Sequence, residues 1–266
     1  MAAGVSSRMK KSSSSQNMSK TQLDQSNKRM KGFIQVGEGM EPLIYYIIKN
    51  AISAEINNFY IIISGDSKDF QEYLKSLENK LGISLKFAFQ DFYGQEKPSG
   101  TSDAIFQTMN QYKELMKTRF LVCNCDNLYS SKAMELLKRE KNYNSMIAYD
   151  YECLDFSNER LSSFSILKIK NNFLSEITEK PDIEIIINND QKKYVSMNIF
   201  SFIGSKVYKY LKDCPVNIER GEKELASALQ NMILDDKESI KTFSLCEHVP
   251  DMTYKEDIEK INNFLN

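Results

Sequence analysis

Several groups of residues in this chain have the types and spacing that suit chemistry on phosphates. Near the N-terminus, the small residues Ala2, Ala3 and Gly4 are followed by Arg8. Small residues let backbone N–H groups approach phosphate oxygens closely, and arginine adds charge-assisted hydrogen bonds. By composition alone a surface turn is the simpler interpretation, so this stretch is a candidate triphosphate site only in combination with the groups that follow.

A second group is the glycine-bearing turn Pro98-Ser99-Gly100-Thr101, which leads into a predicted helix. Such a turn lays backbone amides against a flat base or binds a phosphate at the start of the helix. An ordinary capped helix start is the competing interpretation. Ser99, Gly100 and Thr101 are therefore candidate nucleotide-binding residues.

Two acids and one lysine complete the set of candidates. Asp126 ends a predicted buried strand, where its carboxylate would suit Mg²⁺ as well as it suits a helix cap. Asp251 lies shortly before the last predicted helix, where an N-terminal cap is the alternative. Lys180, in Glu179-Lys180-Pro181, follows a predicted strand and would present its ammonium group to a phosphate, although an exposed turn lysine is the default.

The remaining inventory excludes several other chemistries. His248 is the only histidine, which rules out a Ser-His-Asp hydrolase and a site with several histidine ligands. No G-x-x-x-x-G-K-[ST] motif is present, which argues against a P-loop enzyme. With 35 basic and 36 acidic side chains, the chain has no charge excess that would favour nucleic acid or a membrane surface as its main partner.

The elements that must position these residues alternate along the first half of the chain. Apolar spacing predicts helices over 42–56, 67–81, 102–116 and 130–140, and continuous or alternating apolar runs predict strands over 59–63, 84–89, 119–123 and 145–149. Such alternation predicts βαβ units and a parallel sheet with helices on both faces. Ligands of these sheets bind beyond the carboxyl ends of the strands, and Asp126 lies at such an end.

The second half has a different pattern. It predicts a hairpin of strands over 163–169 and 173–178, strands over 194–202 and 240–245, and helices over 222–234 and 254–265. We therefore expect an α/β fold, a Rossmann-like three-layer αβα domain with a mixed, mostly parallel central sheet. The 266 residues are expected to form one domain.

Composition also predicts one flexible segment and the cellular compartment of the protein. Residues 10–29 are polar and serine-rich without apolar periodicity, which predicts a flexible loop. The five cysteines are odd in number and scattered, so we expect no disulfide framework and a reducing compartment. No signal-peptide core or membrane-spanning run is visible, which indicates a cytoplasmic protein.

Taken in order, these groups resemble the motifs of the sugar-nucleotide pyrophosphorylase family of nucleotidyltransferases, over the whole chain. The sequence from Ala2 to Arg8 resembles its LAAG-x-x-x-R loop, and Met30-Lys31 falls at its Pro-Lys. The other matches are the P-x-G-T-A turn at 98–104, the metal motif at 124–126, E-K-P at 179–181, N-x-G-x-Y/F at 198–202 and D-x-G-T-P-E-D at 251–257.

The resemblance implies an in-line transfer. A phosphorylated acceptor, most simply a sugar 1-phosphate, would attack the α-phosphorus of a nucleoside triphosphate and release pyrophosphate, with Mg²⁺ as cofactor. It also implies a role for each matching residue. The nucleotide would be bound by Ala3, Gly4, Ser99, Gly100 and Thr101, the triphosphate by Arg8 and Lys31, the acceptor's phosphate by Lys180, the rest of the acceptor by Glu179 and Asn198, and Mg²⁺ by Asp126 and Asp251.

The sequence departs from the family pattern at its start. The family's opening strand would precede Ala2, whereas the sequence begins at Met1. We therefore expect a truncated first strand and a gap in the sheet, with a misplaced start as the preferred explanation. Two alternatives follow: a cytidylyltransferase acting on a non-sugar phosphorylated alcohol, or an inactive nucleotide-binding regulatory homologue. The base, the acceptor and the oligomeric state are left open.

Overall fold

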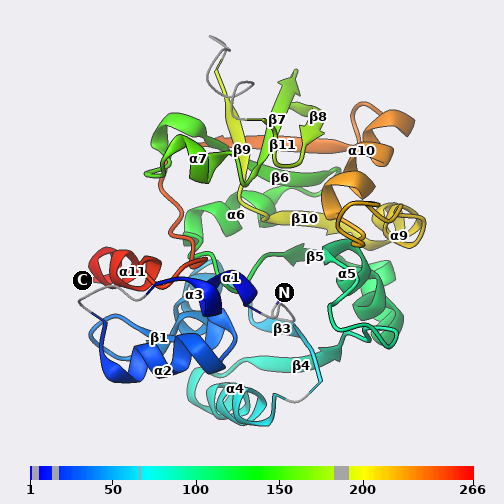
Figure 1. Cartoon of the computed structure of the whole chain (residues 1–266). Coiled ribbons are helices and arrows are strands. Elements are labelled where there is room, and N and C mark those ends of the chain that lie inside the picture. The colour runs from blue at the N-terminus through cyan, green and yellow to red at the C-terminus, as the bar shows by residue number, and fades with distance from the viewer. Residues whose placement is uncertain (2–5, 14–17, 66, 183–191) are drawn as a thin grey trace. The chain divides into compact units, whose positions relative to one another are not determined.

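A computed structural model describes residues 1, 6–13, 18–65, 67–182 and 192–266 (Figure 1). The chain divides into two compact units. Unit 1 contains Met1–Pro98, Asn124–Lys132 and Val249–Asn266, and unit 2 contains Ser99–Cys123 and Ala133–His248. Each unit therefore combines segments that are distant in the sequence.

Unit 1 is mainly helical around two short sheets. Its helices are α1 (Ser7–Lys11), α2 (Lys20–Lys28), the 3₁₀ turn η1 (Lys31–Phe33), α3 (Leu43–Ser53), α4 (Lys68–Leu81) and α11 (Asp257–Leu265). Its strands are β1 (Gln35–Val36), β2 (Glu41–Pro42), β3 (Asn58–Ile63) and β4 (Ser84–Phe89). β1 pairs antiparallel with β2, and β3 pairs parallel with β4 from Asn58↔Ser84 to Ile63↔Phe89.

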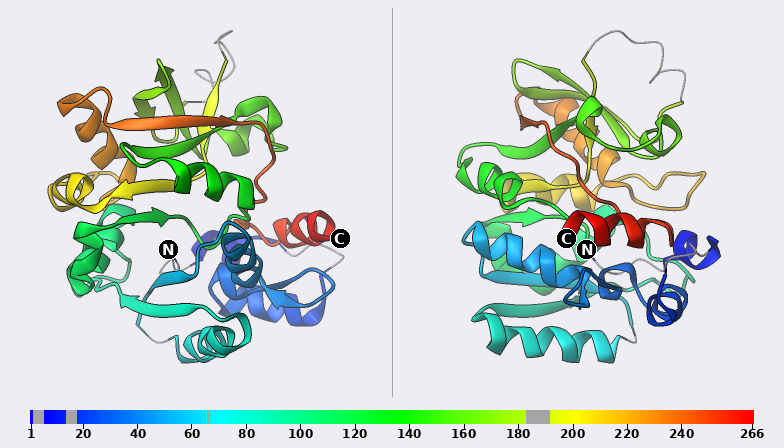
Figure 2. Two further views of the ribbon diagram at one scale, coloured as in Figure 1. Left: turned by 180° about the vertical axis from the view of Figure 1, so that it is seen from behind. Right: turned by 90° about the vertical axis from the view of Figure 1, so that its left-hand side faces the viewer.

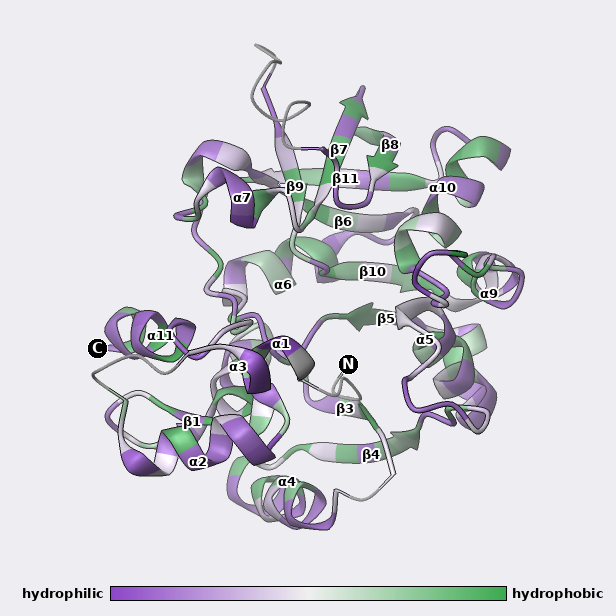
Figure 3. Cartoon of the chain, in the orientation of Figure 1, coloured by the Kyte–Doolittle hydropathy of each residue, from purple (hydrophilic) through white to green (hydrophobic). Residues whose placement is uncertain are grey.

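The core of unit 1 joins α3, α4, η1 and the parallel strand pair. Helix α4 shows the expected amphipathic pattern, with Phe70, Leu74 and Leu77 buried. In Figure 3 this helix carries both hydrophobic and hydrophilic residues. These side chains share one cluster with apolar residues of the neighbouring elements, including Ile44, Ile48, Ile63, Leu85 and Phe33. The predicted strands at 59–63 and 84–89 and the helices beside them are thereby confirmed.

Helix α2 stands where we expected a loop. Ser19 and Gln22 form a capping box, in which the Gln22 N–H donates to Ser19 Oγ at 3.1 Å and the Ser19 N–H donates to Gln22 Oε1 at 3.3 Å. The helix buries Gln22, Gln25 and Ser26 instead of an apolar stripe. Gln22 Nε2 donates to the Gln35 carbonyl at 3.1 Å, and the Gln35 N–H donates to Gln25 Oε1 at 2.9 Å. Hydrogen bonds to β1 therefore anchor this helix, and apolar periodicity could not reveal it.

Unit 2 is built around one large sheet. Its strands are β5 (Arg119–Val122), β6 (Asn144–Asp150), β7 (Ser165–Lys170), β8 (Phe173–Thr178), β9 (Tyr194–Ser196), β10 (Phe200–Ile203) and β11 (Ile240–Leu245). Its helices and 3₁₀ turns are α5 (Thr101–Gln111), η2 (Lys113–Lys117), α6 (Ser131–Arg139), η3 (Tyr151–Cys153), α7 (Asn158–Leu161), α9 (Gly204–Lys212) and α10 (Leu225–Asp235). The first residues of α6, Ser131 and Lys132, belong to unit 1.

The strands of unit 2 hydrogen-bond in the order β11-β8-β7-β9-β6-β10-β5, and β11 also pairs with β6. The β6–β11 pairing is parallel and runs from Ile240↔Asn144 to Leu245↔Tyr149, and the two strands lie side by side in Figures 1 and 2. The other pairings among the described strands of this sheet are antiparallel. The α/β class and the mixed sheet are as expected, whereas parallel pairing is the minority among the described strands.

The strand predicted over 194–202 is two strands. β9 pairs with the end of β6 at Tyr149 and Asp150, and β10 pairs with its beginning at Ser145 and Met146. Between them Asn198 has a φ of 59°, in the left-handed region that interrupts a strand. β9 and β10 therefore follow one another along β6 with a kink at Asn198.

Unit 2 also contains a disulfide between Cys153, in η3, and Cys246, just after β11. Their Cα atoms are 5.2 Å apart, within the usual range for a disulfide. This single disulfide departs from the expectation of no disulfide framework. Parallel pairing of β6 with β11 brings the two cysteines, 93 positions apart, to the same strand ends. No helix in the described part of the chain is long and apolar enough to cross a membrane.

Candidate active site

Unit 1 brings together three of the predicted site residues, Lys31, Asp126 and Asp251. Lys31 begins η1, Asp126 lies in the loop 124–130, and Asp251 lies in the loop before α11. The two loops pair through an antiparallel bridge between Asn127 and Asp251. Backbone hydrogen bonds extend this pairing on either side, from the Met252 N–H to the Asp126 carbonyl at 2.8 Å and from residue 128 to residue 250 at 2.9 Å.

Lys31 forms an ion pair with Asp126 inside this cluster. Lys31 Nζ lies 2.9 Å from Asp126 Oδ2, and the two side chains are only 12% and 21% exposed. Burial alone would raise the pKa of the Asp126 carboxyl, but the Lys31 ammonium beside it holds that pKa below its ordinary value. The carboxylate is therefore charged at neutral pH and able to bind a cation.

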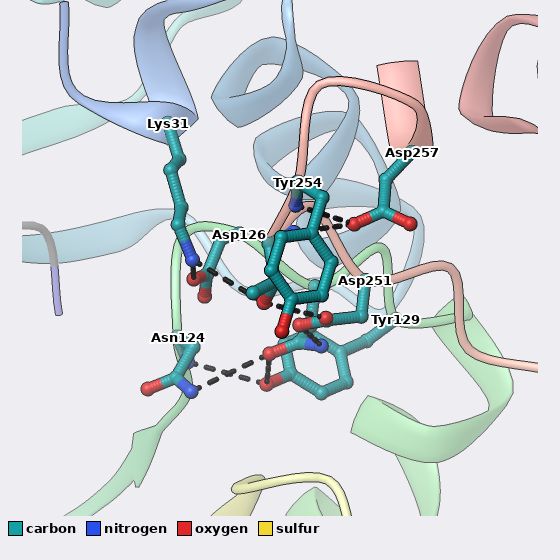
Figure 4. Close-up of polar contacts among 9 residues, drawn as sticks. Lys31, Asn124, Asp126, Tyr129, Asp251, Tyr254 and Asp257 are labelled. Atoms are coloured by element: carbon teal, nitrogen blue, oxygen red, sulfur yellow. Dashed lines mark hydrogen bonds and ion pairs between the residues drawn. The ribbon is translucent and has the colours of Figure 1, made fainter. Parts of the chain in front are cut away.

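The Asp251 carboxylate is held at both oxygens. Asn127 Nδ2 donates to Oδ1 at 2.9 Å, and the Thr253 hydroxyl donates to Oδ2 at 2.8 Å. Asp251, Asn127 and Thr253 are all buried. Figure 4 shows Lys31, Asp126 and Asp251 in this cluster, with Tyr129 and Asn124 beside them.

Two further contacts support the loops that carry the acids. The hydroxyl of fully buried Tyr129 lies 3.4 Å from Asn127 Oδ1 and accepts the Asn124 N–H at 3.3 Å. On the other loop, Asp257 Oδ2 accepts the N–H groups of Thr253 and Tyr254 at 2.8 and 2.7 Å (Figure 4). Asp257 thereby ties the turn after Asp251 to the start of α11.

The cysteine next to Asp126 is not suited to nucleophilic chemistry. Burial, with a contribution from the Asp126 carboxylate, raises the pKa of the Cys125 thiol to about 11. A thiol with such a pKa is protonated at neutral pH, and the thiolate is the reactive form. Cys125 also packs against Gly32, where an added Cβ would lie 3.0 Å from Cys125 Sγ, so its role is packing.

The other predicted residues of unit 1 lie at the N-terminus. Ala3 and Gly4 lie outside the described residues. Arg8 is in α1, and its side chain is exposed. The described structure therefore connects neither the small-residue loop nor Arg8 to the acid cluster.

In unit 2, the turn at Ser99, Gly100 and Thr101 is locked against Lys223. The Lys223 N–H donates to the Ser99 carbonyl at 2.7 Å, and the Leu225 N–H donates to Thr101 Oγ1 at 3.1 Å. Gly100 has a φ of +104°, and an added Cβ would lie 2.5 Å from the Lys223 carbonyl oxygen. Glycine is therefore required here by the backbone conformation and by close packing.

The predicted acceptor residues also lie in unit 2. The side chain of Glu179 bonds to the Ser165 hydroxyl and lies 3.9 Å from an Arg220 guanidinium nitrogen. Burial raises the pKa of the Glu179 carboxyl. Lys180 is exposed with a φ of 45°, and Asn198 is half-buried at the kink between β9 and β10.

Sequence reasoning missed several polar residues around the predicted ones. In unit 1 these are Asn127, Tyr129 and Thr253, which hold the acids and their loops. In unit 2, Arg220 also pairs with Glu224, the residue before α10. The only sequence signal for them was proximity to a motif, because single neutral polar residues have no periodicity.

Known proteins resemble this chain along most of its length. A sequence profile of the family described as "Nucleotidyl transferase" matches residues 24–261. The chain is 23% identical over 225 residues to the bifunctional protein GlmU of Methanocaldococcus jannaschii, a match that covers 85% of this chain. It spans 47% of that relative, about half its length.

Solved structures show the same fold. One is assigned as a glucose-1-phosphate thymidylyltransferase of Bacillus anthracis, in complex with sucrose. It superposes with a TM-score of 0.71 at 19% identity, over 99% of this chain and 92% of that one. A UDP-glucose pyrophosphorylase complexed with UDP-glucose gives a TM-score of 0.71 at 16% identity, over 99% and 95%. With the family profile matching most of its length, this chain belongs to the nucleotidyl transferase family.

Proposed function

We propose that this protein transfers a nucleoside monophosphate from a nucleoside triphosphate to a phosphorylated acceptor, most simply a sugar 1-phosphate, and releases pyrophosphate. The observation that carries the proposal is the cluster of Lys31, Asp126 and Asp251 in unit 1, in which Asp251 is buried and the other two side chains are mostly covered. The names of the similar proteins, among them a UDP-glucose pyrophosphorylase in complex with UDP-glucose, support a sugar phosphate as acceptor. Both units would then belong to a single nucleotidyltransferase domain of the three-layer Rossmann-like type.

The donor set of this cluster fits a Mg²⁺ ion. Magnesium prefers oxygen ligands and is usually bound by one or two carboxylates together with substrate phosphates. No group of three or more His, Cys, Asp or Glu residues suited to a metal was found in the described part of the chain. Asp126 and Asp251 would thus supply the carboxylate ligands, and phosphate oxygens of the triphosphate would supply further ligands. Mg²⁺ bound there would neutralise charge on the phosphates.

In the proposed reaction an oxygen of the acceptor's phosphate attacks the α-phosphorus of the triphosphate. A new bond forms between this oxygen and the α-phosphorus. The bond between the α-phosphorus and the oxygen that bridges to the β-phosphorus breaks, and pyrophosphate leaves with that electron pair. Lys31 and Arg8 would bind the departing phosphates, and Lys180 would bind the acceptor's phosphate. Positioning and charge neutralisation suffice for such a transfer, so the chain needs no covalent nucleophile.

The remaining substrate contacts are assigned by motif. Ala3, Gly4 and the turn Ser99–Thr101 would bind the nucleotide. Glu179 and Asn198 would bind the acceptor, and Arg220, which pairs with Glu179, would add a cation beside that carboxylate. A cytoplasmic location is also part of the proposal.

The test is pyrophosphate release from each of four nucleoside triphosphates with Mg²⁺ and a panel of sugar 1-phosphates and polyol phosphates. We expect release that requires one triphosphate and one acceptor, and Asp126→Asn to reduce it by orders of magnitude while the far-UV circular dichroism is unchanged. Release with a polyol phosphate alone would favour the non-sugar alternative. If the protein binds nucleotide without releasing pyrophosphate, and Asp126→Asn does not change that binding, the inactive regulatory homologue would be favoured over the enzyme.

A further inference from the structure

The Thr253 hydroxyl lies between the two halves of the acid cluster. It is 2.8 Å from Asp251 Oδ2 and 3.4 Å from Lys31 Nζ, and Lys31 is the ion-pair partner of Asp126. A lysine ammonium has no acceptor capacity, and a hydroxyl has one proton to donate. Thr253 must therefore accept from Lys31 and donate to Asp251.

This arrangement is fixed by the surroundings of Thr253. The residue is 4% exposed, and its N–H donates to Asp257 Oδ2 at 2.8 Å. Asp257 is itself buried at the first position of α11 and also accepts the Tyr254 N–H. Asp257 thereby anchors the backbone of Thr253 to the start of α11.

The hydroxyl connects residues from three separate parts of the chain. Lys31 and Thr253 are 222 positions apart, and Lys31 and Asp126 are 95 apart. The other contact to Asp251, from Asn127, holds Oδ1. Together Asn127 and Thr253 fix the plane of the Asp251 carboxylate relative to the loop that carries Asp126.

We propose that Thr253 is a positioning residue for the metal site: its hydroxyl orients Asp251 for the divalent cation and couples it to the Lys31–Asp126 pair. This inference rests on the proposed function, since it assumes that Asp126 and Asp251 bind the cation. Residues that hydrogen-bond to a metal ligand typically contribute about 10–100-fold to metal affinity or activity. Thr253 acts through Asp251 and touches no substrate in this scheme.

The test compares Thr253→Val, which is similar in shape but has no hydroxyl, with Thr253→Ser, which keeps it. Mn²⁺ alone is titrated into each purified 266-residue protein, and free Mn²⁺ is followed by electron paramagnetic resonance. We expect Thr253→Val to weaken Mn²⁺ binding about 10-fold or more and Thr253→Ser to stay near wild type. In pyrophosphate release, Thr253→Val should raise the Mg²⁺ concentration for half-maximal rate more than it lowers the rate at saturating Mg²⁺.

Equal Mn²⁺ affinity in Thr253→Val and wild type would overturn the proposal, as would a Thr253→Ser variant as weak as Thr253→Val. If Thr253→Val loses its native circular dichroism, Thr253→Ala takes its place, because alanine adds no atom that must be accommodated. The double variant Asp126→Asn, Asp251→Asn sets the background. Wild-type binding no better than this background would refute the metal site and the role of Thr253 together, whereas pyrophosphate release by the wild type tests the proposed function separately.

Discussion

Glu140 is a buried carboxylate in unit 2 whose contribution to stability should depend on pH. Its Oε1 accepts the N–H groups of Lys141, Asn142 and Tyr143 at 3.0, 2.8 and 3.3 Å, and its Oε2 lies 2.8 Å from Lys241 Nζ in β11. Burial would raise the pKa of Glu140, but the Lys241 ammonium and the backbone N–H groups lower it from 4.5 to about 2. Folding therefore favours the charged form.

The magnitude follows from that pKa difference. At about 1.4 kcal/mol per pKa unit, the lowering corresponds to about 3 kcal/mol of stability for the ionised side chain. Glu140 is 6% exposed, but Lys241 is 35% exposed, so solvent screening reduces the contribution. We expect Glu140→Gln to lower the free energy of unfolding by about 1.5–3 kcal/mol at pH 7, because glutamine loses the charge and turns a donor toward Lys241.

The sign of the pH dependence is fixed. A carboxyl whose pKa is depressed on folding stabilises the protein above its unfolded pKa, 4.5 here, and the stabilisation disappears as pH falls through the folded pKa of about 2. The difference between wild type and Glu140→Gln should be full at pH 7 and should shrink as the pH is lowered from about 5 toward 2.

The assay is urea denaturation followed by far-UV circular dichroism, since the chain has no tryptophan. Glu176→Gln is the matched control: Glu176 also lies 2.8 Å from a lysine, Lys168, but the two side chains are 44% and 65% exposed. The control should change stability by less than about 1 kcal/mol. The reasoning fails if both variants lose the same stability, or if Glu140→Gln loses as much at pH 3 as at pH 7.

Three further predictions concern the acceptor site, one glycine and the disulfide. Lys180→Ala should raise the KM for the acceptor about 10-fold or more and leave nucleotide binding nearly unchanged, and equal loss of both would reject its proposed role. Gly204→Ala places a Cβ 1.8 Å from a backbone carbonyl oxygen, so it should lower the free energy of unfolding by at least about 2 kcal/mol, measured by thermal or urea denaturation. The control Gly39→Ala should be close to neutral, because its added Cβ would come no closer than 3.5 Å to a neighbouring atom. Thiol titration of the native oxidised protein should leave Cys153 and Cys246 unreactive. Reduction should lower the melting temperature, since a native disulfide contributes about 2–5 kcal/mol to the free energy of unfolding. A melting temperature unchanged by reductant would contradict this prediction.

The elements that were predicted correctly have an apolar signal in the sequence itself. β3 is a run of apolar residues and α4 repeats Phe70, Leu74 and Leu77 on one face, so burial and periodicity coincide. Helix α2 has no such signal. Its buried face consists of Gln22, Gln25 and Ser26, which hydrogen-bond rather than pack, so only the structure reveals it.

The residues of the candidate site also differ in how far the sequence could identify them. Lys31, Asp126 and Asp251 could be selected from the sequence because they fall, in order, at motifs that resemble those of the sugar-nucleotide pyrophosphorylase family. Ala3, Gly4, Arg8, Lys180 and Asn198 were selected on the same grounds, and their substrate contacts remain proposals.

The sequence by itself determined which side chains are candidates for the chemistry and most of the elements that bear them, because residue type and apolar spacing are local properties. Only the tertiary structure decided that Asn127 and Thr253 hold Asp251 and that Lys31 faces Asp126. Asn127 and Asp251 are 124 positions apart, and a neutral amide or hydroxyl gains its role only when a distant loop places a carboxylate within hydrogen-bonding distance. The same holds for the bond between Cys153 and Cys246, which depends on the parallel pairing of β6 with β11.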